Sequence, residues 1–497
     1  MKQLLCILAV LCFAAGCSQA QADLIAQIHF LGGEEISADT NSPGFTNEFC
    51  SAAARVLENQ ALDKLSAAPT SWFKAKLPSH AIDGSKQLRP LLDDFLKSEW
   101  IFEMRDTTNG SPEYALAIRL DNQRAQLWSA NLRALVESWT AIHAQNTSDG
   151  WRLKKDLPPN LFQFSRRGDW VILDCGQNDL SLGNEVFASA TKTAETNWLT
   201  ASVDWPRLAQ LYPTPGKLDF PKFSFQTVGY EGCFYISGSL DLAQPLPPLE
   251  KWRVPTNEIS QPFDSFTAAR GLGPWLEKQD WFRPFRLQPQ PDQFFIWALP
   301  GIPFETYGAE PVPNANAALA QIRQRLTGNT NWQNQLMPLK VIPSDGKILF
   351  SMPFMSPYLQ ADHETNGDFL TGGFLPNWPG SGPLPEQLAG ELNTPGTVYY
   401  HWELTQDRLK ELPELTQLIL MTVEYRQLGD SAAESWLKSL KFKPGPTITV
   451  AGETTPTQVQ FIRTAPGGLT ALEFLALANW LDSPNFPSLV IPKAVFE

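Results

Sequence analysis

Paired runs of alternating apolar and polar residues are the feature that most constrains this fold. Residues 100–120 contain two such runs on either side of Asn109-Gly110, a pair that adopts the positive φ angles of a tight turn at little cost. Comparable pairs of runs occupy residues 223–242, 358–375 and 448–464. Each pair predicts a β-hairpin. Because a hairpin joins antiparallel strands that each bury one face, we expect mainly antiparallel sheets.

A second pattern marks the places where a strand-like run turns helical. There, a polar residue precedes an arginine by three positions: Asp121 and Arg124, Asp204 and Arg207, Thr405 and Arg408. A side-chain oxygen at the start of a helix accepts a hydrogen bond from a free amide, which stabilises the helix by about 1 kcal/mol. We therefore interpret the first residue of each pair as a helix cap. The alternative, an anion site at the helix start that uses the arginine, stays open.

These capped segments suggest an internal repeat. Residues 198–212 align with residues 399–413 so that Asp204 coincides with Thr405 and Arg207 with Arg408. We expect an α+β fold whose antiparallel β-sheets are built from approximate strand–capped helix–hairpin units, with helices packed on one face. Helical spacing of apolar residues further predicts a helix over 43–66, and Thr470 with Glu473 predicts a capping box.

The length of 497 residues indicates more than one domain. Prolines are frequent over residues 243–262, where a regular element cannot continue for long. We expect an N-terminal α+β domain over 23–245, a proline-rich connector over 246–290 and a C-terminal α+β domain over 291–497.

The first residues predict export. Lys2 precedes an apolar run over residues 4–15 and then small residues, so residues 1–22 have the form of a signal peptide. Two processing sites compete: a lipoprotein box that ends at Cys17, which would become the site of lipid attachment, and Ala20-Gln21-Ala22 before Asp23. We expect a cell-envelope protein, either an outer-membrane lipoprotein or a periplasmic protein. A modified Cys17 would make the membrane a partner through an N-terminal lipid anchor.

Three of the six cysteines lie beyond the predicted signal peptide: Cys50, Cys175 and Cys233. Cys175 and Cys233 both fall in strand-like runs and form the candidate disulfide in an oxidising compartment. The alternative is that all three are buried thiols.

Charge and motifs exclude several functional classes. The chain has 39 Lys and Arg against 52 Asp and Glu, and no basic stripe, so we expect no nucleic-acid partner. It contains no H-E-x-x-H, C-x-x-C, phosphate-binding loop or G-x-S-x-G motif. We therefore predict no cofactor and no catalytic residue from the sequence.

One segment has the beginning of a calcium loop. Oxygen-bearing side chains alternate at Asp362, Glu364, Asn366 and Asp368, as calcium ligands do. However, the twelfth position is Gly373, where such a loop needs a carboxylate. We favour the alternative, an acidic hairpin tip that turns at Asn366-Gly367, and expect no metal.

Three stretches resemble a family of large exported bacterial proteins with no assigned activity: QIHFLGGEEISADTN with LDKLSAAPTSWF, DSFTAARGLGPWL and LALANWLDSPNFP. The resemblance would cover nearly the whole mature chain and implies export and an α+β body of several units. It implies no catalytic residue.

The functional hypothesis is accordingly a lipid-anchored envelope protein with a binding or scaffolding role, whose partner is an unknown protein, glycan or apolar ligand. Two alternatives remain. An envelope hydrolase with a site assembled from distant residues would require a cleft that unites His363 or His401 with carboxylates. A periplasmic carrier would require an apolar cavity lined by Phe and Leu.

Overall fold

The computed structural model describes residues 24–488 except 107–111, 155–160, 177–180, 193–195, 213–219, 260–262, 279–284, 301–304, 329–339, 345, 352–355, 376–385 and 411–430. It divides into two compact units. Unit 1 consists of Met1–Asp241 and Asn479–Leu489, and unit 2 of Leu242–Ala478 and Val490–Glu497.

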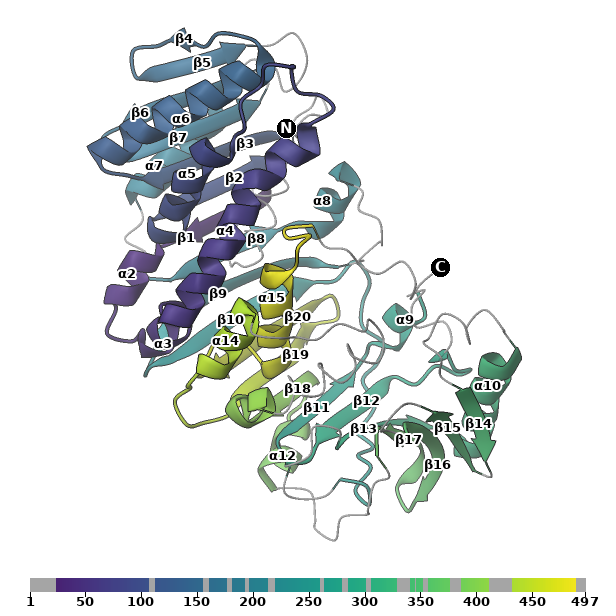
Figure 1. Cartoon of the computed structure of the whole chain (residues 1–497). Helices are drawn as coiled ribbons and strands as arrows, with labels where there is room; N and C mark the ends of the chain where they lie inside the picture. Colours follow the sequence, from purple (N-terminus) through teal and green to yellow (C-terminus); the bar gives the residue numbers. More distant parts are fainter. Residues whose placement is uncertain are drawn as a thin grey trace. The chain divides into compact units, whose positions relative to one another are not determined.

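Unit 1 is an antiparallel sheet with helices (Figure 1). Its strands are β1 (Leu24–Phe30), β2 (Trp100–Arg105), β3 (Glu113–Arg119), β4 (Gln145–Asn146), β5 (Gly150–Lys154), β6 (Leu161–Arg167), β7 (Trp170–Gly176), β8 (Leu199–Val203), β9 (Lys222–Tyr230) and β10 (Cys233–Asp241). Its helices are α2 (Gly33–Ala38), α3 (Pro43–Phe49), α4 (Ala52–Phe73), α5 (Ser85–Lys97), α6 (Asn122–Thr140), α7 (Ser181–Lys192) and α8 (Trp205–Leu211). Neighbouring strands follow the order β4-β5-β6-β7-β3-β2-β1-β8-β9-β10, all antiparallel.

Unit 2 is built in the same way. Its strands are β11 (Ser265–Arg270), β12 (Gln293–Ala298), β13 (Thr306–Val312), β14 (Lys340–Ser344), β15 (Lys347–Ser351), β16 (Tyr358–Glu364), β17 (Gly367–Gly373), β18 (Thr397–Glu403), β19 (Thr447–Thr455) and β20 (Gln458–Ala465). Its helices are α9 (Gly273–Leu276), α10 (Ala315–Gly328), α12 (Glu386–Leu392), α14 (Ala432–Ser439) and α15 (Ala471–Asp482), of which the last residues belong to unit 1. The strand order is β14-β15-β16-β17-β13-β12-β11-β18-β19-β20, again all antiparallel.

The two strand orders are identical when ten is added to each strand number of unit 1. The register of the strands agrees as well: the Asp204 amide donates to the Ile25 carbonyl at 2.8 Å, and the Leu404 amide donates to the Asp264 carbonyl at 2.8 Å. Seven residues after Ile25 and Asp264, each chain segment passes through a glycine with positive φ, Gly32 at 97° and Gly271 at 80°. The chain therefore contains the same fold twice, and the predicted α+β class with antiparallel sheets is confirmed.

Local structure follows the sequence closely. The four predicted hairpins are β2–β3, β9–β10, β16–β17 and β19–β20. The caps at Asp121 and Asp204 are confirmed, since they accept from the amides of Arg124 at 2.7 Å and Arg207 at 3.1 Å. The helix expected over 43–66 is divided into α3 and α4, because Ser51 between them caps α4 through the Ala54 amide.

The cap predicted at Thr405 is wrong. The helix over residues 405–410 begins at Thr405, and its preceding residue Leu404 provides the carbonyl that accepts from the Arg408 amide at 3.0 Å. The position of Asp204 therefore corresponds to Leu404, one residue earlier than the sequence alignment indicates. The Thr405 hydroxyl instead donates to Glu403 Oε1 at 3.0 Å.

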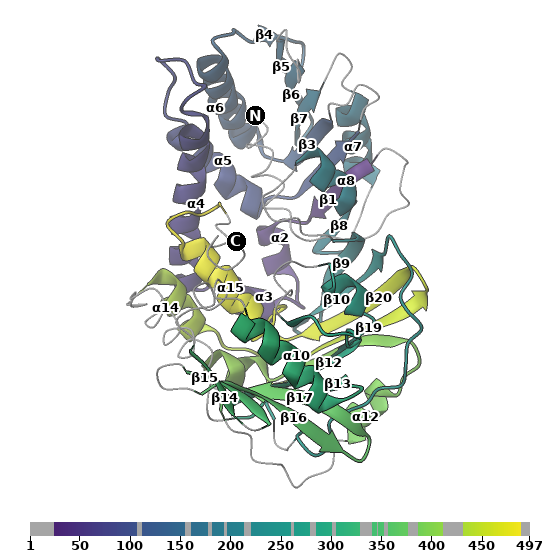
Figure 2. The ribbon, with the colours of Figure 1, turned by 90° about the vertical axis from the view of Figure 1, so that its right-hand side faces the viewer.

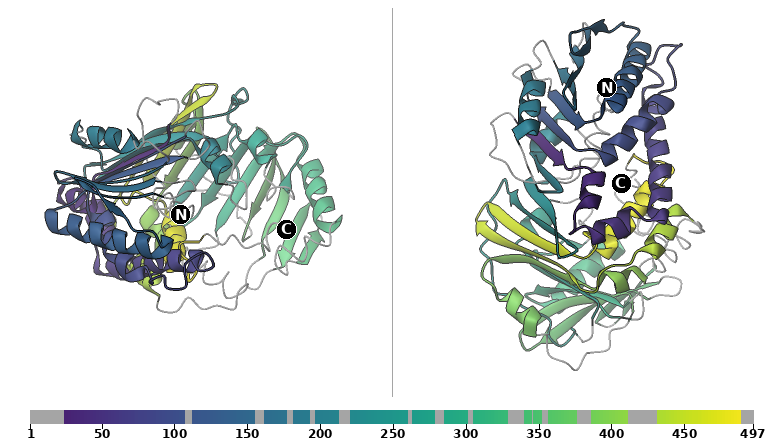
Figure 3. Two further views of the ribbon diagram at one scale, coloured as in Figure 1. Left: turned by 90° about the horizontal axis from the view of Figure 1, so that it is seen from above. Right: turned by 90° about the vertical axis from the view of Figure 1, so that its left-hand side faces the viewer.

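Helices cover both faces of the unit 1 sheet. Trp128 and Leu132 of α6 share a core with Leu116 and Ile118 of β3, as do Leu91 and Phe95 of α5. On the opposite face, Leu182 and Val186 of α7 pack against Ala115 and Ala117 of the same strand. The sequence predicted helices on one face of the sheet only, and α7 on the opposite face corrects this prediction for unit 1. In unit 2, α10 lies over β16 and β17 at one end of the sheet (Figures 2 and 3).

The segment between the first two strands differs most between the units. Helices α2 to α5 connect β1 to β2, whereas the described residues between β11 and β12 contain only the four-residue helix α9. The predicted connector 246–290 includes β11, which pairs with both β12 and β18 and so belongs to the sheet of unit 2. The predicted C-terminal domain 291–497 also includes residues that belong to unit 1. Phe486, for example, packs with Leu62 and Leu65 of unit 1.

Candidate functional site

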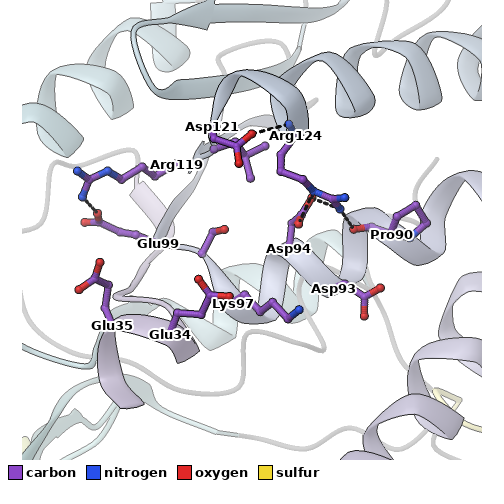
Figure 4. A pocket seen from close by; sticks show the side chains of 12 residues that line it. Glu34, Glu35, Pro90, Asp93, Asp94, Lys97, Glu99, Arg119, Asp121 and Arg124 are labelled. Atoms are coloured by element: carbon purple, nitrogen blue, oxygen red, sulfur yellow. Dashed lines mark hydrogen bonds and ion pairs between the residues drawn. The ribbon is translucent and has the colours of Figure 1, made fainter. Parts of the chain in front are cut away.

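A charged hollow of about 530 Å³ opens on unit 1 (Figure 4). Its lining residues are Glu34, Glu35, Pro90, Asp93, Asp94, Lys97, Ser98, Glu99, Arg119, Leu120, Asp121 and Arg124. Six of these twelve side chains are carboxylates and three are cationic, so the hollow is acidic.

The backbone at Gly32 brings two sides of this hollow together. At φ of 97°, a Cβ on Gly32 would lie 2.6 Å from the Lys97 carbonyl oxygen, so only glycine allows this approach to the end of α5. Helix α2 starts immediately afterwards and carries Glu34 and Glu35 in its first turn. The turn from β3 into α6 supplies Arg119 and Asp121 from the opposite side (Figure 4).

Asp94 and Arg124 neutralise each other in one wall. Arg124 donates through Nε and Nη2 to the Asp94 carboxylate at 2.7 to 2.9 Å and through Nη2 to the Pro90 carbonyl at 2.9 Å. The indole of Trp128 also donates to Asp94 at 2.8 Å. With its carboxylate bonded to α6 in this way, Asp94 joins α5 to α6 and has a structural role.

Glu99 links the hollow to a buried histidine. Its Oε1 lies 3.0 Å from His29 Nε2, and its Oε2 accepts from Arg119 Nη1 at 3.4 Å. His29 lies on β1 with 6% of its surface exposed. The pair places a hydrogen-bonded imidazole behind the carboxylate that faces the hollow.

The remaining charges are directed at solvent. Within the described part of the chain, no hydrogen bond or ion pair involves the side chains of Glu34, Glu35 or Lys97, all of which are exposed. Asp121 is exposed and caps its own helix. Three exposed carboxylates and one ammonium are thus available to a ligand, which favours a cationic ligand.

A second polar cluster lies on the sheet of unit 2, where His401 and Thr449 are buried and Thr267 and Arg463 are half-buried. Thr267, His401, Thr449 and Arg463 lie side by side on β11, β18, β19 and β20. Thr267 Oγ1 lies 2.8 Å from His401 Nδ1, and Arg463 donates through Nε to Thr449 Oγ1 at 2.9 Å. Arg463 also forms two bonds with Glu473, at 2.8 and 3.1 Å.

The neighbouring groups change the protonation of this cluster. Burial, followed by the charge of Arg463, lowers the pKa of His401 to about 4, so its imidazole is neutral near pH 7. Burial raises the pKa of Glu403, which accepts from the Ala471 amide at 2.8 Å. The confirmed capping box between Thr470 and Glu473 holds the start of α15 beside these groups.

The two histidines named for the hydrolase alternative have different surroundings. His401 lies near Glu473 but is 7% exposed. His363 is exposed, and its Nδ1 lies 2.8 Å from Asp368 Oδ1. Neither of them lines the charged hollow of unit 1.

The candidate calcium ligands do not converge. Asn366 donates to the Val254 carbonyl, Glu364 accepts from the Asn257 amide, and Asp368 accepts from the Ala315 amide. Asp362 accepts from the His363 amide. The four residues thus lie in the β16–β17 hairpin with separate partners. Among the described residues, no group of three or more His, Cys, Asp or Glu side chains could hold a metal ion.

The candidate disulfide between Cys175 and Cys233 is wrong, since Cys50, Cys175 and Cys233 are all thiols. Cys175 lies on β7 and Cys233 on β10, with five strands between them. Six strand spacings of roughly 4.8 Å separate these strands by about 29 Å, far beyond the Cα separation of a disulfide. Cys17 lies outside the described residues.

The three arginines that follow the predicted helix caps have different surroundings. Arg124 lines the hollow of unit 1, Arg207 pairs with Asp106 at 3.0 Å, and Arg408 is buried in unit 2. The hollow contains Asp121 but not Asp204. Sequence reasoning did not identify Glu34, Glu35, Glu99 or Arg119, whose only local signal is the pair of acidic residues after Gly32-Gly33.

In the part of the chain that is described, no helix combines the length and apolar character needed to cross a membrane. No protein-family model, curated protein or solved structure matches the chain. The resemblance to exported bacterial proteins therefore stays a prediction.

Proposed function

We propose that this chain is an exported, lipid-anchored envelope protein that binds a small cationic molecule in the charged hollow of unit 1. The observation that carries the proposal is the exposed group of Glu34, Glu35 and Asp121 around a hollow whose other carboxylates are already neutralised. A primary or secondary amine would meet these three carboxylates.

The size of the hollow supports a small ligand. Binding sites for small molecules commonly enclose about 300–1,000 Å³, and the hollow of about 530 Å³ falls in this range. Its charge supports the sign of the ligand, because an excess of carboxylates raises the local concentration of cations and steers their approach.

The lining argues for binding over the two alternatives. Nine of twelve lining residues are charged, and an apolar ligand would have to desolvate them without offering hydrogen bonds in return. For a hydrolase, the only hydroxyl among the lining residues is that of Ser98, and Glu99 is held by His29 and Arg119. This arrangement supports recognition more than proton transfer to a nucleophile.

Calorimetric titration of the mature chain with spermidine tests the ligand. We expect binding that weakens as salt is raised and that falls at least about tenfold in the double variant Glu34→Gln, Glu35→Gln, because two favourable charge interactions are lost. Glu277→Gln, which removes an exposed carboxylate from unit 2, is the matched control and should bind as the unaltered chain does. Equal affinity in all three proteins would overturn the proposal, as would a preference for an anion such as citrate.

The anchor has a separate test. Mass spectrometry of the protein purified from membranes should find an acylated N-terminal Cys17, and Cys17→Ser should release the protein into the soluble fraction. An unmodified N-terminus at Asp23 would contradict lipid anchoring without affecting the ligand proposal.

A further inference from the structure

The repeated fold provides an internal comparison. Unit 1 has Ile28, Ala201, Phe225 and Gly238 side by side on β1, β8, β9 and β10. The equivalent positions of unit 2 are Thr267, His401, Thr449 and Arg463, which we call the polar row. Since the same strand order forms with apolar residues in unit 1, the fold itself does not require the polar row.

One atom of the polar row lacks a partner. The other polar groups bond to each other, through the contacts of Thr267 with His401, of Arg463 with Thr449, and of Arg463 with Glu473. His401 is 7% exposed, and no described residue forms a hydrogen bond with its Nε2. A buried polar atom without a partner destabilises the protein, and a bound group that forms a hydrogen bond with it would remove this cost.

The polar row continues into an accessible apolar surface. Thr267 lies opposite Ile296 of β12, which in turn lies opposite Gly308 of β13. Ile296 is 51% exposed. Its equivalent in unit 1, Phe102, is 3% exposed and belongs to the same core as Leu91 and Phe95 of α5.

The reason for this difference is the segment between the first two strands. In unit 1 that segment supplies α5, which covers the sheet, while in the described part of unit 2 it supplies only α9. Ile296 is thus half exposed on a central strand, two strands away from the unsatisfied nitrogen of His401. A ligand with an apolar body and a polar end would contact both residues.

We propose that this face of unit 2 binds a small amphiphilic molecule, whose hydrogen-bond acceptor meets His401 Nε2 and whose apolar body lies on Ile296. Thr267 Oγ1 lies 2.8 Å from Nδ1 and can donate to it, so we assign the proton of the neutral ring to Nε2, which makes that atom a donor. Arg463 is neutralised by Glu473, so an uncharged acceptor such as a carbonyl suits the surroundings better than an anion. This site is separate from the hollow of unit 1 and does not depend on the proposed function.

Fluorescence titration of the full mature chain with the naphthyl ketone Prodan tests the site, because this dye combines an apolar ring system with one carbonyl acceptor. Its analogue without the carbonyl is the matched probe. We expect the ketone to bind more tightly than the analogue. His401→Phe should lower affinity for the ketone about tenfold and leave the analogue unchanged, and His401→Gln, which keeps a donor, should restore part of the loss.

Ile296→Ser tests the apolar half and changes only an exposed side chain, so it remains informative if His401 variants do not fold. It should weaken binding of both probes. Ile462→Ser is its control, since Ile462 is 48% exposed on the same sheet but points to the opposite face from Arg463. Equal binding of the two probes to the unaltered chain would overturn the proposal, and so would unchanged ketone affinity in Ile296→Ser or in a folded His401→Phe.

Discussion

Thr267 and His401 face each other across β11 and β18, with 2.8 Å between Thr267 Oγ1 and His401 Nδ1, and the equivalent positions of unit 1 hold Ile28 and Ala201. One backbone arrangement thus carries a hydrogen-bonded polar pair in one unit and an apolar pair in the other. This comparison distinguishes residues that the fold needs from residues that a particular unit has added.

Gly32→Ala should destabilise the protein more than Gly271→Ala. Both residues have positive φ, which costs a non-glycine residue about 1–2 kcal/mol. A Cβ at Gly32 would also meet backbone atoms of Lys97 and Ser98 at 2.6 and 2.7 Å, whereas at Gly271 it would meet the leucine side-chain end of Leu246 at 3.3 Å. Denaturant unfolding of both variants measures the difference, and equal losses would show that the close approach at Gly32 is unimportant.

Asp94→Asn should lower the free energy of unfolding by about 2 kcal/mol, because Asp94 is only 10% exposed and its charge is the partner of the Arg124 guanidinium and of the Trp128 indole. Asp93→Asn is the adjacent control. The Asp93 side chain is 36% exposed, and its partner Arg89 keeps a second carboxylate, Asp63 at 2.8 Å, so we expect a loss below about 1 kcal/mol. Thermal and denaturant unfolding compare the two. A similar small effect for both would mean that Asp94 does not hold α5 against α6.

Glu48→Gln should change how stability depends on pH. Burial raises the pKa of Glu48 to about 9 in the folded chain, well above its ordinary value of 4.5. The folded chain therefore keeps a proton that the unfolded chain releases, and the stability contributed by this proton is lost as pH rises from about 4.5 to 9. The Gln variant lacks this loss, so its advantage over the unaltered chain should grow with pH to a few kcal/mol near pH 9.

Unfolding free energies at about pH 5, 7 and 9 check this prediction. Glu34→Gln, at an exposed position, should follow the pH dependence of the unaltered chain. Parallel curves for Glu48→Gln and the unaltered chain would contradict a raised pKa at Glu48.

The cysteines should remain reduced in the mature protein. Thiol titration of the denatured, unreduced chain that starts at Asp23 should count three thiols, those of Cys50, Cys175 and Cys233. A count of one would mean that two of the three cysteines form a disulfide, which would contradict the three thiols of the structure. A pair between Cys175 and Cys233 would in addition require a different strand order in unit 1, because β7 and β10 are far apart in the sheet.

Much of the local structure could be predicted from the sequence, because its causes lie within a few residues of one another. The β2–β3 hairpin depends on alternation on both sides of a turn, and the caps at Asp121 and Asp204 depend on an oxygen three residues before a free amide. The repeat was visible too, but misaligned by one residue. The register at Leu404 is set by its bond to Asp264, which lies 140 residues earlier in the chain.

The proline-rich stretch shows the limit of a local argument. The described residues of this stretch, 243–259, form no helix or strand, yet Ser265–Arg270 form β11, which pairs with β12 and β18. The calcium-loop pattern shows the same limit. Alternate residues of a hairpin share a face, but Glu364 and Asn366 find partners near Asn257 and Val254, which no spacing along the hairpin indicates.

By itself, the sequence determined the type of element at each place, since alternation, turn residues and caps act between near neighbours. Only the tertiary structure decided which strands became adjacent. That step placed Glu34 opposite Asp121 around one hollow and Thr267 against His401 on one sheet face. The physical reason is that strand order and register arise from backbone hydrogen bonds and side-chain packing between segments far apart in the chain, and these contacts leave no fixed spacing in the sequence.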